Sequence, residues 1–582
     1  MQKGISVTEV RRIGRAGPWS AAFTVVLWHL LSARLSVHVP FVFGDEAGYL
    51  TKAAALAGHF TDAYSSYYPG YALLIAPWFL GHLNPGHAFE MVQVFNALLA
   101  GLGASGLWVL AGEWMPESRP MRRWVAVVVV GMYPPWVAYS GFALSENALI
   151  VLIIWQAVLV CRQAAHPRAR YALALGWLGG FMWLVHPRGG VLLVVGSAAC
   201  LFGEQPRRQG RWSGAALLLG AAVFVVSHTW LDAYFKSHMG YFDDDLSGHY
   251  PGLAALWTSL AQLLSVKGIG GFASNAAGQV FYLLTASAGL AGVGALALVG
   301  SGWQGRASPA PARRALAVFA MASTVLLVAM TAFFMRDGAR VDQWFYGRYA
   351  EVALPVLMLP GLLCAGSGGR WLVTALLTAL LAGTLMAVHG AVIHGWVVQV
   401  DVLGWALWNA FGVNAFGGHR LGLWLIGAGS VGLMLLLAWW QRTRSWPLGV
   451  AAAFLACSVM ATLTYLRPLS DQFSQQQRIP RYLKQHVPGL ACVNEDRHAS
   501  EYWEHYNLQV FILPMRLHPV DLFTEPKTRK RDRDALTLCS RWLISTRKDL
   551  ATRLPSARLV VHEYASGERL WRLPDGAAKP PR

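Results

Sequence analysis

The sequence predicts a polytopic α-helical membrane protein with a small α/β domain at its C-terminal end. Of its 582 residues, 55% are hydrophobic and 13% are charged, and the mean hydropathy is +0.40. A soluble globular protein contains about 25% charged residues, so this composition indicates a chain that lies mostly within a lipid bilayer. Runs of about 20 apolar residues, the length of a membrane-spanning helix, recur up to residue 466 and then stop.

These apolar runs predict about thirteen membrane-spanning helices. They lie near residues 19–39, 87–113, 122–140, 145–162, 171–186, 188–204, 212–234, 277–302, 314–335, 349–366, 371–393, 420–441 and 446–466. Residues 1–18 are basic and lack a small-residue cleavage site. We therefore expect residues 1–18 to be a cytoplasmic tail, followed by a retained membrane anchor rather than a signal peptide.

The distribution of basic residues predicts the orientation of the spans. With the N-terminus in the cytoplasm, every predicted inner loop contains at least one Arg, as the positive-inside rule requires. Most acidic residues of the membrane region then fall at or toward the outer face. We expect an inner-membrane protein with its N-terminus inside and its C-terminal domain outside. The net charge of +18 follows mostly from this bias, and without a basic stripe interleaved with aromatics it does not suggest a nucleic-acid partner.

Residues 467–582 are predicted to form an extracytoplasmic α/β domain. Their charge density is higher, and short β-like runs occur at residues 490–493, 542–545, 559–564 and 569–573. Residues 565–568 separate the last two runs as a hairpin turn, and an aromatic-rich helix is expected at 501–506 and a polar loop at 524–534. An oxidising compartment would permit a disulfide between Cys492 and Cys539, although two unpaired thiols are an equally good interpretation.

The first outer loop, residues 40–86, contains adjacent carboxylates just beyond the first span, Asp45 and Glu46. An acidic pair at a membrane face needs a function that offsets its desolvation, although a solvated loop pair is the simpler alternative. Lys52 follows in the same loop. Residues 71–83 of this loop are apolar, but the stretch is too short to cross a bilayer. We therefore expect an interfacial helix there, preceded by Tyr68.

Later outer segments bring further charged residues to the same face. Glu146 stands at the head of a span, where it would also favour the helix dipole without any catalytic role. His186 and Arg188 occupy a tight turn, where Arg188 is either a ligand or a snorkelling side chain. Arg348 and Tyr349 precede a late span. A guanidinium suits a phosphate because it offers planar bidentate donors, and an interfacial anchor is the alternative.

A divalent metal ion is the one cofactor that the sequence suggests. Three consecutive carboxylates, Asp243, Asp244 and Asp245, lie in the fourth outer loop with His249 nearby. Carboxylate oxygens are ligands for hard divalent cations, although a solvated acidic loop explains the same residues.

The order of these features resembles the GT-C glycosyltransferase superfamily. The shared features are an N-terminal span, an outer loop with an Asp-Glu pair, a Tyr-Pro-rich interfacial segment, many further spans, and an Arg-Tyr pair before a late span. Within the superfamily, residues 15–466 look like the protein O-mannosyltransferases and the bacterial lipid A aminoarabinose transferases. The chain lacks the inserted sugar-fold domain of the former, and it has Pro-Gly at 69–70 where the latter have Pro-Pro.

The resemblance implies transfer of a sugar from a polyprenyl-phosphate carrier to a lipid, glycan or protein acceptor at the outer face. Asp45 would match the catalytic base, Glu46 its neighbour, and Glu146 the acidic residue of the second outer loop. The leaving phosphate would need cations. The predicted substrate-binding residues are Arg348, Arg188, Lys52, Tyr349, His186 and Tyr68.

Two other classes of protein remain open from the sequence. A secondary transporter also has many spans, but it usually shows repeated halves with interrupted helices, and we find no internal repeat. A non-enzymatic envelope-assembly or flippase-like protein would tolerate the loss of Asp45, so substitution of Asp45 separates these classes.

Overall fold

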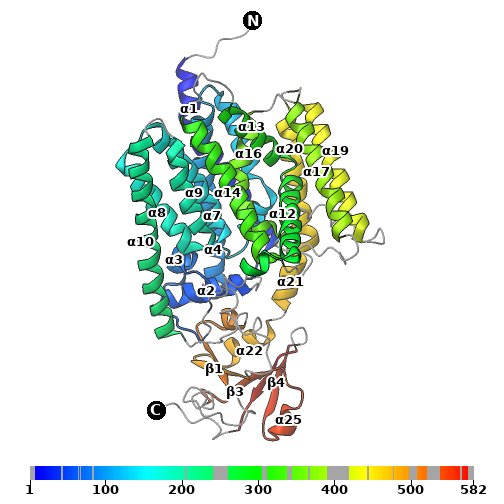
Figure 1. Cartoon of the computed structure of the whole chain (residues 1–582). Coiled ribbons are helices and arrows are strands. Elements are labelled where there is room, and N and C mark those ends of the chain that lie inside the picture. The colour runs from blue at the N-terminus through cyan, green and yellow to red at the C-terminus, as the bar shows by residue number, and fades with distance from the viewer. Residues whose placement is uncertain are drawn as a thin grey trace.

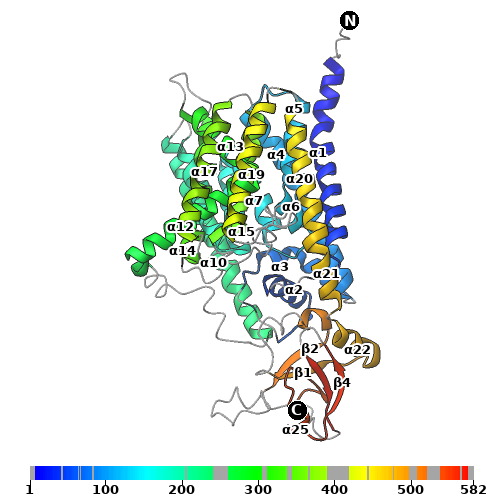
Figure 2. The same cartoon turned by 90° about the vertical axis from the view of Figure 1, so that its right-hand side faces the viewer.

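The computed structural model describes residues 7–40, 44–62, 65, 67–81, 84–202, 206–239, 260–303, 311–336, 344–364, 368–389, 419–441, 443, 445–475, 477–496, 508–520, 538–563 and 567–574. It has a bundle of helices and a small C-terminal sheet at one end of that bundle (Figure 1). Helix α1 begins at the opposite end of the bundle (Figure 2). The predicted combination of a helical membrane protein and a C-terminal sheet is confirmed.

The bundle consists of helices whose outward faces carry large apolar side chains. In its first half the long helices are α1 (Val7–Ser36), α4 (Pro85–Trp114), α7 (Glu146–Ala165), α8 (Ala169–Val185), α9 (Arg188–Ala199) and α10 (Pro206–His238). In its second half they are α12 (Val266–Ala286), α13 (Leu290–Trp303), α14 (Pro311–Met335), α16 (Leu354–Leu363), α17 (Gly368–His389), α19 (His419–Trp440) and α20 (Trp446–Ala461). Exposed residues such as Leu27, Trp177 and Leu380 fit a surface that contacts lipid, since helices that are apolar all round are buried or membrane-embedded.

The expected number of about thirteen spans is not confirmed. Among the described residues, six helices are long and apolar enough to cross a membrane, or seven if the pair α12 and α13 counts as one span.

Two of the predicted spans are broken helices. The span expected at 277–302 is divided between α12 and α13, which meet at 101°. Ala288 and Gly289 at this bend have positive φ angles of 51° and 81°, which interrupt the helix. The span expected at 122–140 is divided between α5 (Pro120–Gly131) and α6 (Pro134–Tyr139). Consecutive prolines at the start of α6 account for this break, because proline removes a backbone donor and restricts the preceding residue.

The first outer segment contains a helix that the sequence analysis did not predict, in addition to the expected interfacial one. Helix α2 (Gly44–Leu56) carries Asp45 and Glu46 in its first turn, where negative side chains stabilise the positive end of the helix dipole. The expected interfacial helix is divided into α3 (Gly70–Ile75) and a 3-10 turn at Ala76–Phe79. Both α2 and α3 lie at the end of the bundle nearest the sheet (Figure 1).

A continuous helix joins the bundle to the C-terminal domain. Helix α20 passes through a π-helical turn at Thr462–Leu466 into α21 (Arg467–Gln475). Figure 2 shows α21 extending from the bundle toward the sheet. The expected domain boundary at residue 467 therefore lies within this helix.

The C-terminal domain contains α22 (Arg478–His486), a short helix α25 (Leu550–Arg553) and a five-stranded sheet. Its strands are β1 (Cys492–Asp496), β2 (Arg516–Val520), β3 (Trp542–Ser545), β4 (Arg558–His562) and β5 (Arg569–Arg572), in the order β2-β1-β3-β5-β4. Strand β1 is parallel to β2 and β3, whereas β5 is antiparallel to β3 and β4.

The predicted β4–β5 hairpin is observed, and strand β2 is the one that the sequence analysis missed. Strand β2 contains Pro519, which weakens a strand pattern, and it lies at the edge of the sheet. The helix expected at 501–506 and the polar loop expected at 524–534 fall outside the described residues.

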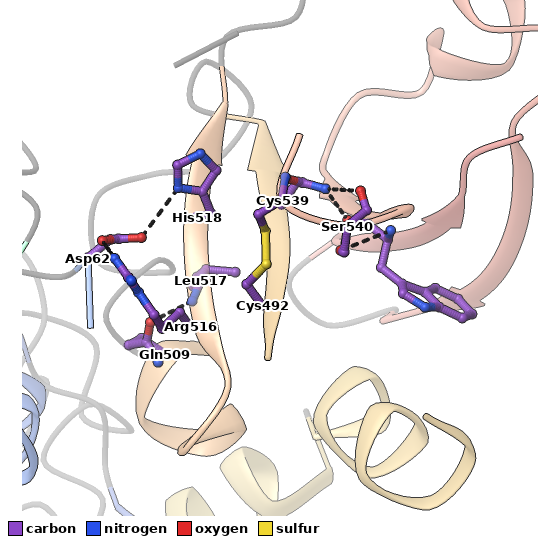
Figure 3. The surroundings of a disulfide bond; sticks show 10 residues. Asp62, Cys492, Gln509, Arg516, Leu517, His518, Cys539 and Ser540 are labelled. Carbon is purple, nitrogen blue, oxygen red and sulfur yellow. Dashed lines mark hydrogen bonds and ion pairs between the residues drawn. A yellow bond between two sulfur atoms is a disulfide. The ribbon is translucent and has the colours of Figure 1, made fainter. Parts of the chain in front are cut away.

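A disulfide joins Cys492 to Cys539, which resolves the two alternatives for these thiols (Figure 3). The same segment is fixed by the side chain of Asn494. Its amide nitrogen donates to the carbonyl oxygens of Ser540 and Trp542 at 2.6 and 2.8 Å, and its oxygen accepts from the backbone nitrogen of Cys539 at 2.8 Å. The start of β1 is therefore held covalently to the chain that enters β3.

Charged residues connect the C-terminal domain to the first outer segment. Asp62, just beyond α2, forms an ion pair with Arg516 and lies 3.3 Å from Nδ1 of His518 (Figure 3). Burial alone would raise the pKa of Asp62, but His518 and Arg516 together hold it below its ordinary value. At a second contact between the two parts of the protein, Nε2 of His38, just beyond the end of α1, lies 2.8 Å from Oδ1 of Asp471 in α21. The domain is thus attached at two places to the end of the bundle that carries α2.

Candidate active site

A cluster of buried charges surrounds Glu146, the first residue of α7. Its carboxylate has no exposed surface. Arg188 donates from Nη2 to Oε1 at 2.6 Å, and Arg348 donates from Nε to the same oxygen at 3.0 Å and from Nη2 to Oε2 at 3.2 Å. Two guanidinium groups therefore share one carboxylate in an interior from which water is excluded.

Arg348 also connects this buried centre to Asp45. Its Nη2 lies 2.6 Å from Oδ2 of Asp45, and the exposed fractions of the two side chains are 7% and 24%. Glu146, Arg348 and Asp45 thus form a chain of ionised groups that begins in the interior and ends at a partly exposed carboxylate. Asp45 is the member of this chain that a substrate can reach.

All three nitrogens of the Arg188 guanidinium group donate hydrogen bonds. Its Nη1 donates to the carbonyl oxygens of Arg348 and Tyr349, both at 3.1 Å, so it fixes the backbone as well as the charge of the α15 turn (Gly347–Ala350). Its Nε and its backbone nitrogen both donate to Nδ1 of His186, at 3.0 and 3.2 Å. Since Nδ1 accepts twice, a proton on the neutral ring belongs at Nε2. The guanidinium also lies 4.6 Å from the centre of the Tyr349 ring, a cation–π distance.

Glycines next to both arginines allow this close arrangement. A Cβ at Gly189 would lie 2.1 Å from the carbonyl carbon of Met182 in α8. A Cβ at Gly347 would lie 1.8 Å from the ring of Tyr282 in α12. Neither position can accept a side chain without movement of its neighbours. The sequence therefore places Arg188 beside a glycine that packs on the backbone of α8, and Arg348 beside a glycine that packs on the Tyr282 ring of α12.

A second buried carboxylate lies three residues beyond Arg348. Glu351 accepts hydrogen bonds from the hydroxyl groups of Tyr133, Tyr139 and Tyr282, the first at 3.2 Å. These tyrosines come from the start of α6, its end, and α12. The sequence analysis missed them because tyrosines at membrane level also occur as ordinary core or interfacial residues. Their hydroxyl groups fasten the turn that carries Arg348 to two other helices.

Glu46, the neighbour of Asp45, lies in the interior of the protein. It is fully buried, and its Oε1 accepts from the backbone nitrogen of Ala143 at 2.8 Å. That contact ties the first turn of α2 to the chain between α6 and α7. The position of Asp45 is therefore supported by its own neighbour in sequence.

Lys52 and Tyr68 belong to another part of the protein, beside α10. The ammonium of Lys52 is buried, donates to the carbonyl oxygen of Tyr67, and lies 5.1 Å from the ring of Phe235. Tyr68 stacks on His228 with ring centres 5.0 Å apart. Of the predicted site residues, the structure thus brings together Asp45, Glu146, His186, Arg188, Arg348 and Tyr349.

The metal hypothesis gains no support from the described residues, among which no three or more His, Cys, Asp or Glu side chains are grouped to hold an ion. Asp243, Asp244 and Asp245 lie outside the described part of the chain.

The buried centre predicts a large effect of neutralising Glu146. In Glu146→Gln, the fully buried guanidinium of Arg188 loses the carboxylate that compensates its charge, and removal of one partner from a buried pair typically destabilises by about 3–5 kcal/mol. We expect the purified variant to lose about this much unfolding free energy, measured by denaturation in detergent.

The matched control is Glu113→Gln. Glu113 pairs with Arg162 at 3.2 Å, but both side chains are about one-third exposed, so its loss should cost less than about 1 kcal/mol. Equal effects of the two substitutions would contradict the view that Glu146 is the charge on which the buried centre depends.

The sequence matches no protein-family model and no curated protein sequence. Several solved membrane-protein structures are similar in fold. The ArnT structure from Cupriavidus metallidurans, bound to undecaprenyl phosphate, aligns with a TM-score of 0.52 at 16% identity, over 96% of this chain and 98% of that chain.

Two further structures align less closely. The oligosaccharyltransferase of Archaeoglobus fulgidus gives a TM-score of 0.41 at 11% identity, over 90% of this chain and 69% of that chain. The arabinosyltransferase EmbB of Mycobacterium smegmatis gives 0.38 at 15% identity, over 88% of this chain and 44% of that chain. The alignment with ArnT extends over nearly the whole of both chains, and this protein has the fold of the GT-C glycosyltransferases.

Proposed function

We propose that this protein is an integral membrane glycosyltransferase that moves a sugar from a polyprenyl-phosphate carrier to a lipid, glycan or protein acceptor. The observation that carries the proposal is the partly exposed Asp45 carboxylate at the end of the buried chain of charges. The fold likeness supports it, since the ArnT structure that aligns with almost the whole chain was solved with undecaprenyl phosphate bound.

Asp45 acts as the general base of an inverting single displacement. Its carboxylate takes the proton of the acceptor hydroxyl while the hydroxyl oxygen forms a bond to the anomeric carbon of the sugar. The bond between that carbon and the phosphate oxygen breaks, and the polyprenyl phosphate leaves with the electron pair. A positioned base is typically responsible for about 10²–10⁴-fold of the rate.

Arg348 is the cation best placed to serve both halves of this reaction. It contacts Asp45 at 2.6 Å, so a phosphate that reaches Arg348 also lies beside the base. The inner contacts with Glu146 fix the guanidinium plane, which reduces the entropy lost when a phosphate binds. Arg188 donates hydrogen bonds to the backbone of the α15 turn that carries Arg348. Lys52 is a separate cation near α10.

The reaction takes place at the extracytoplasmic face of the inner membrane. Asp45 lies in α2, on the same side of the bundle as the C-terminal domain (Figure 2), and that domain contains the Cys492–Cys539 disulfide. Disulfides persist in oxidising compartments, which supports an outer location. The excess of arginine in the loops on the other side supports the same orientation.

Asp45→Asn should reduce transfer from a polyprenyl-phosphate sugar by about 10²–10⁴-fold without loss of folding, because the amide keeps the shape but cannot take the proton. Turnover of the purified variant measures this. Glu90→Gln is the control, since Glu90 is also a carboxylate in an ion pair but its side chain is 51% exposed on α4. Wild-type turnover in Asp45→Asn would exclude Asp45 as the base, whereas absence of transfer by the wild-type protein itself would favour a transporter or flippase-like protein.

Arg348→Ala should weaken binding of the polyprenyl-phosphate donor by about tenfold to a hundredfold, the loss expected for hydrogen bonds to a charged group. Arg348→Lys should recover only part of this affinity, because an ammonium lacks the bidentate geometry. Donor titrations at fixed acceptor concentration measure both. Equal donor affinity in all three proteins would leave Arg348 as the residue that orients Asp45 and would move the phosphate site toward Arg188.

The orientation can be tested with reporters that are active only outside the cytoplasm. A fusion after Pro468 should be active and a fusion near Arg208 inactive, because the first follows the last predicted span and the second lies in the arginine-rich first turn of α10. An active fusion at Arg208, or an inactive one at Pro468, would remove Asp45 from the outer face.

A further inference from the structure

A cavity of about 830 Å³ lies where the C-terminal domain meets the membrane domain. Residues 58–60 and 84–85 line it from the membrane side. Residues 488–491 and 513–516, together with Lys484, line it from the C-terminal domain. Two parts of the chain that are distant in sequence therefore face each other across one open cavity, a common position for a binding site.

The charged groups that line this cavity in the described part of the chain are basic. They are Lys484 and Arg516, with the imidazole of His59 beside them, and no carboxylate belongs to the lining among the residues that the structure describes. Arg516 is partly neutralised, because it pairs with Asp62. Lys484 has no carboxylate partner among the residues that the structure describes.

The membrane side adds a further positive contribution. Asn84 is the N-cap of the 30-residue helix α4, and its side chain accepts from the backbone nitrogens of Gly86 and His87 at 3.1 and 3.4 Å. The positive end of the α4 dipole is therefore at the wall of the cavity. Burial of the Lys484 ammonium by neighbouring atoms lowers its pKa, although the side chain as a whole stays exposed, so an anion would stabilise its charged form.

The cavity is separate from the candidate active site. Asp45 lies at one end of α2, and Gly58 of the cavity lies just beyond the other end. A helix of 13 residues is about 20 Å long. A group bound in the cavity is therefore too far from Asp45 to react there, but it can belong to an extended molecule whose hydroxyl reaches Asp45.

We propose that this cavity is an anion-binding subsite that takes a phosphate or carboxylate group of the acceptor, held between Lys484 and Arg516. Assignment of the anion to the acceptor rests on the proposed function, whereas binding of the anion does not. The subsite selects acceptors that carry a negative charge about 20 Å from the reacting hydroxyl. Either a lipid headgroup or a soluble glycan phosphate supplies this chemistry.

The test is covalent labelling of full-length protein in phosphatidylcholine nanodiscs with pyridoxal 5′-phosphate. Its aldehyde condenses with the unprotonated amine of a lysine to form an imine and water, and added borohydride reduces the imine to a stable secondary amine. Peptide mass spectrometry then reports the labelled fraction at each lysine. Pyridoxal, which has the same aldehyde but no phosphate, is the matched probe.

We expect Lys484 to be labelled about tenfold more by pyridoxal 5′-phosphate than by pyridoxal, the preference that one charge-assisted hydrogen bond provides. Lys548, exposed in the same domain and outside the cavity lining, should be labelled equally by both. Arg516→Gln should reduce the preference at Lys484, whereas Arg558→Gln, on exposed strand β4, should not.

Competition separates the two sources of the anion. Protection of Lys484 by inorganic phosphate indicates a soluble group, and protection on exchange of phosphatidylcholine for phosphatidylglycerol indicates a lipid headgroup. Equal labelling by the two aldehydes, or labelling that neither competitor reduces, would overturn the subsite. The experiment is repeated in Asp45→Asn protein, where the result should be the same, so failure of the subsite is distinct from failure of the proposed transferase activity.

Discussion

The architecture around the candidate active site depends on one carboxylate placed between two guanidinium groups. Glu146 contacts Arg188 at 2.6 Å and Arg348 at 3.0 Å, with no exposed surface of its own. Transfer of any one of these charges into the interior alone would be prohibitive, and even a buried pair regains its desolvation energy only with good geometry and further hydrogen bonds. The backbone carbonyls and the His186 ring that surround Arg188 supply those bonds.

This interaction fixes the relative positions of segments that are far apart in the sequence. Glu146 begins α7, Arg188 begins α9, and Arg348 lies in the short α15 turn. Each of the three residues stands at a helix end, where the backbone can approach its neighbours closely. Because Arg348 also contacts Asp45, the first turn of α2 takes its position from the same centre. Glu351 and its three tyrosine partners hold the α15 turn from its other side.

Several residues of the candidate site could be selected from the sequence, whereas their contacts with one another could not. Charged residues are scarce in a membrane protein, so Glu146, Arg188 and Arg348 were recognisable individually, and a predicted topology placed them at one face. Hydropathy reports how apolar a segment is, but not where its backbone bends, so the break at Ala288 and the helical form of α2 were missed. Pairing across long distances in sequence, such as that of Asp45 with Arg348, depends on how helices pack and has no local pattern.

Exposure increases along the chain of charges, and this gradient separates the residues that can take part in chemistry from those that support it. The exposed fractions of the side chains are 0% for Glu146, 7% for Arg348 and 24% for Asp45. Coulomb interactions are strongest where water is excluded, so the inner contacts of Arg348 hold while its outer contact with Asp45 is weakened by solvent. In the proposed reaction, an entering acceptor or phosphate would therefore compete for the Asp45 end of the chain of charges and leave the Glu146 end intact. The same arginine can thus be rigidly held on its inner side and exchange partners on its outer side.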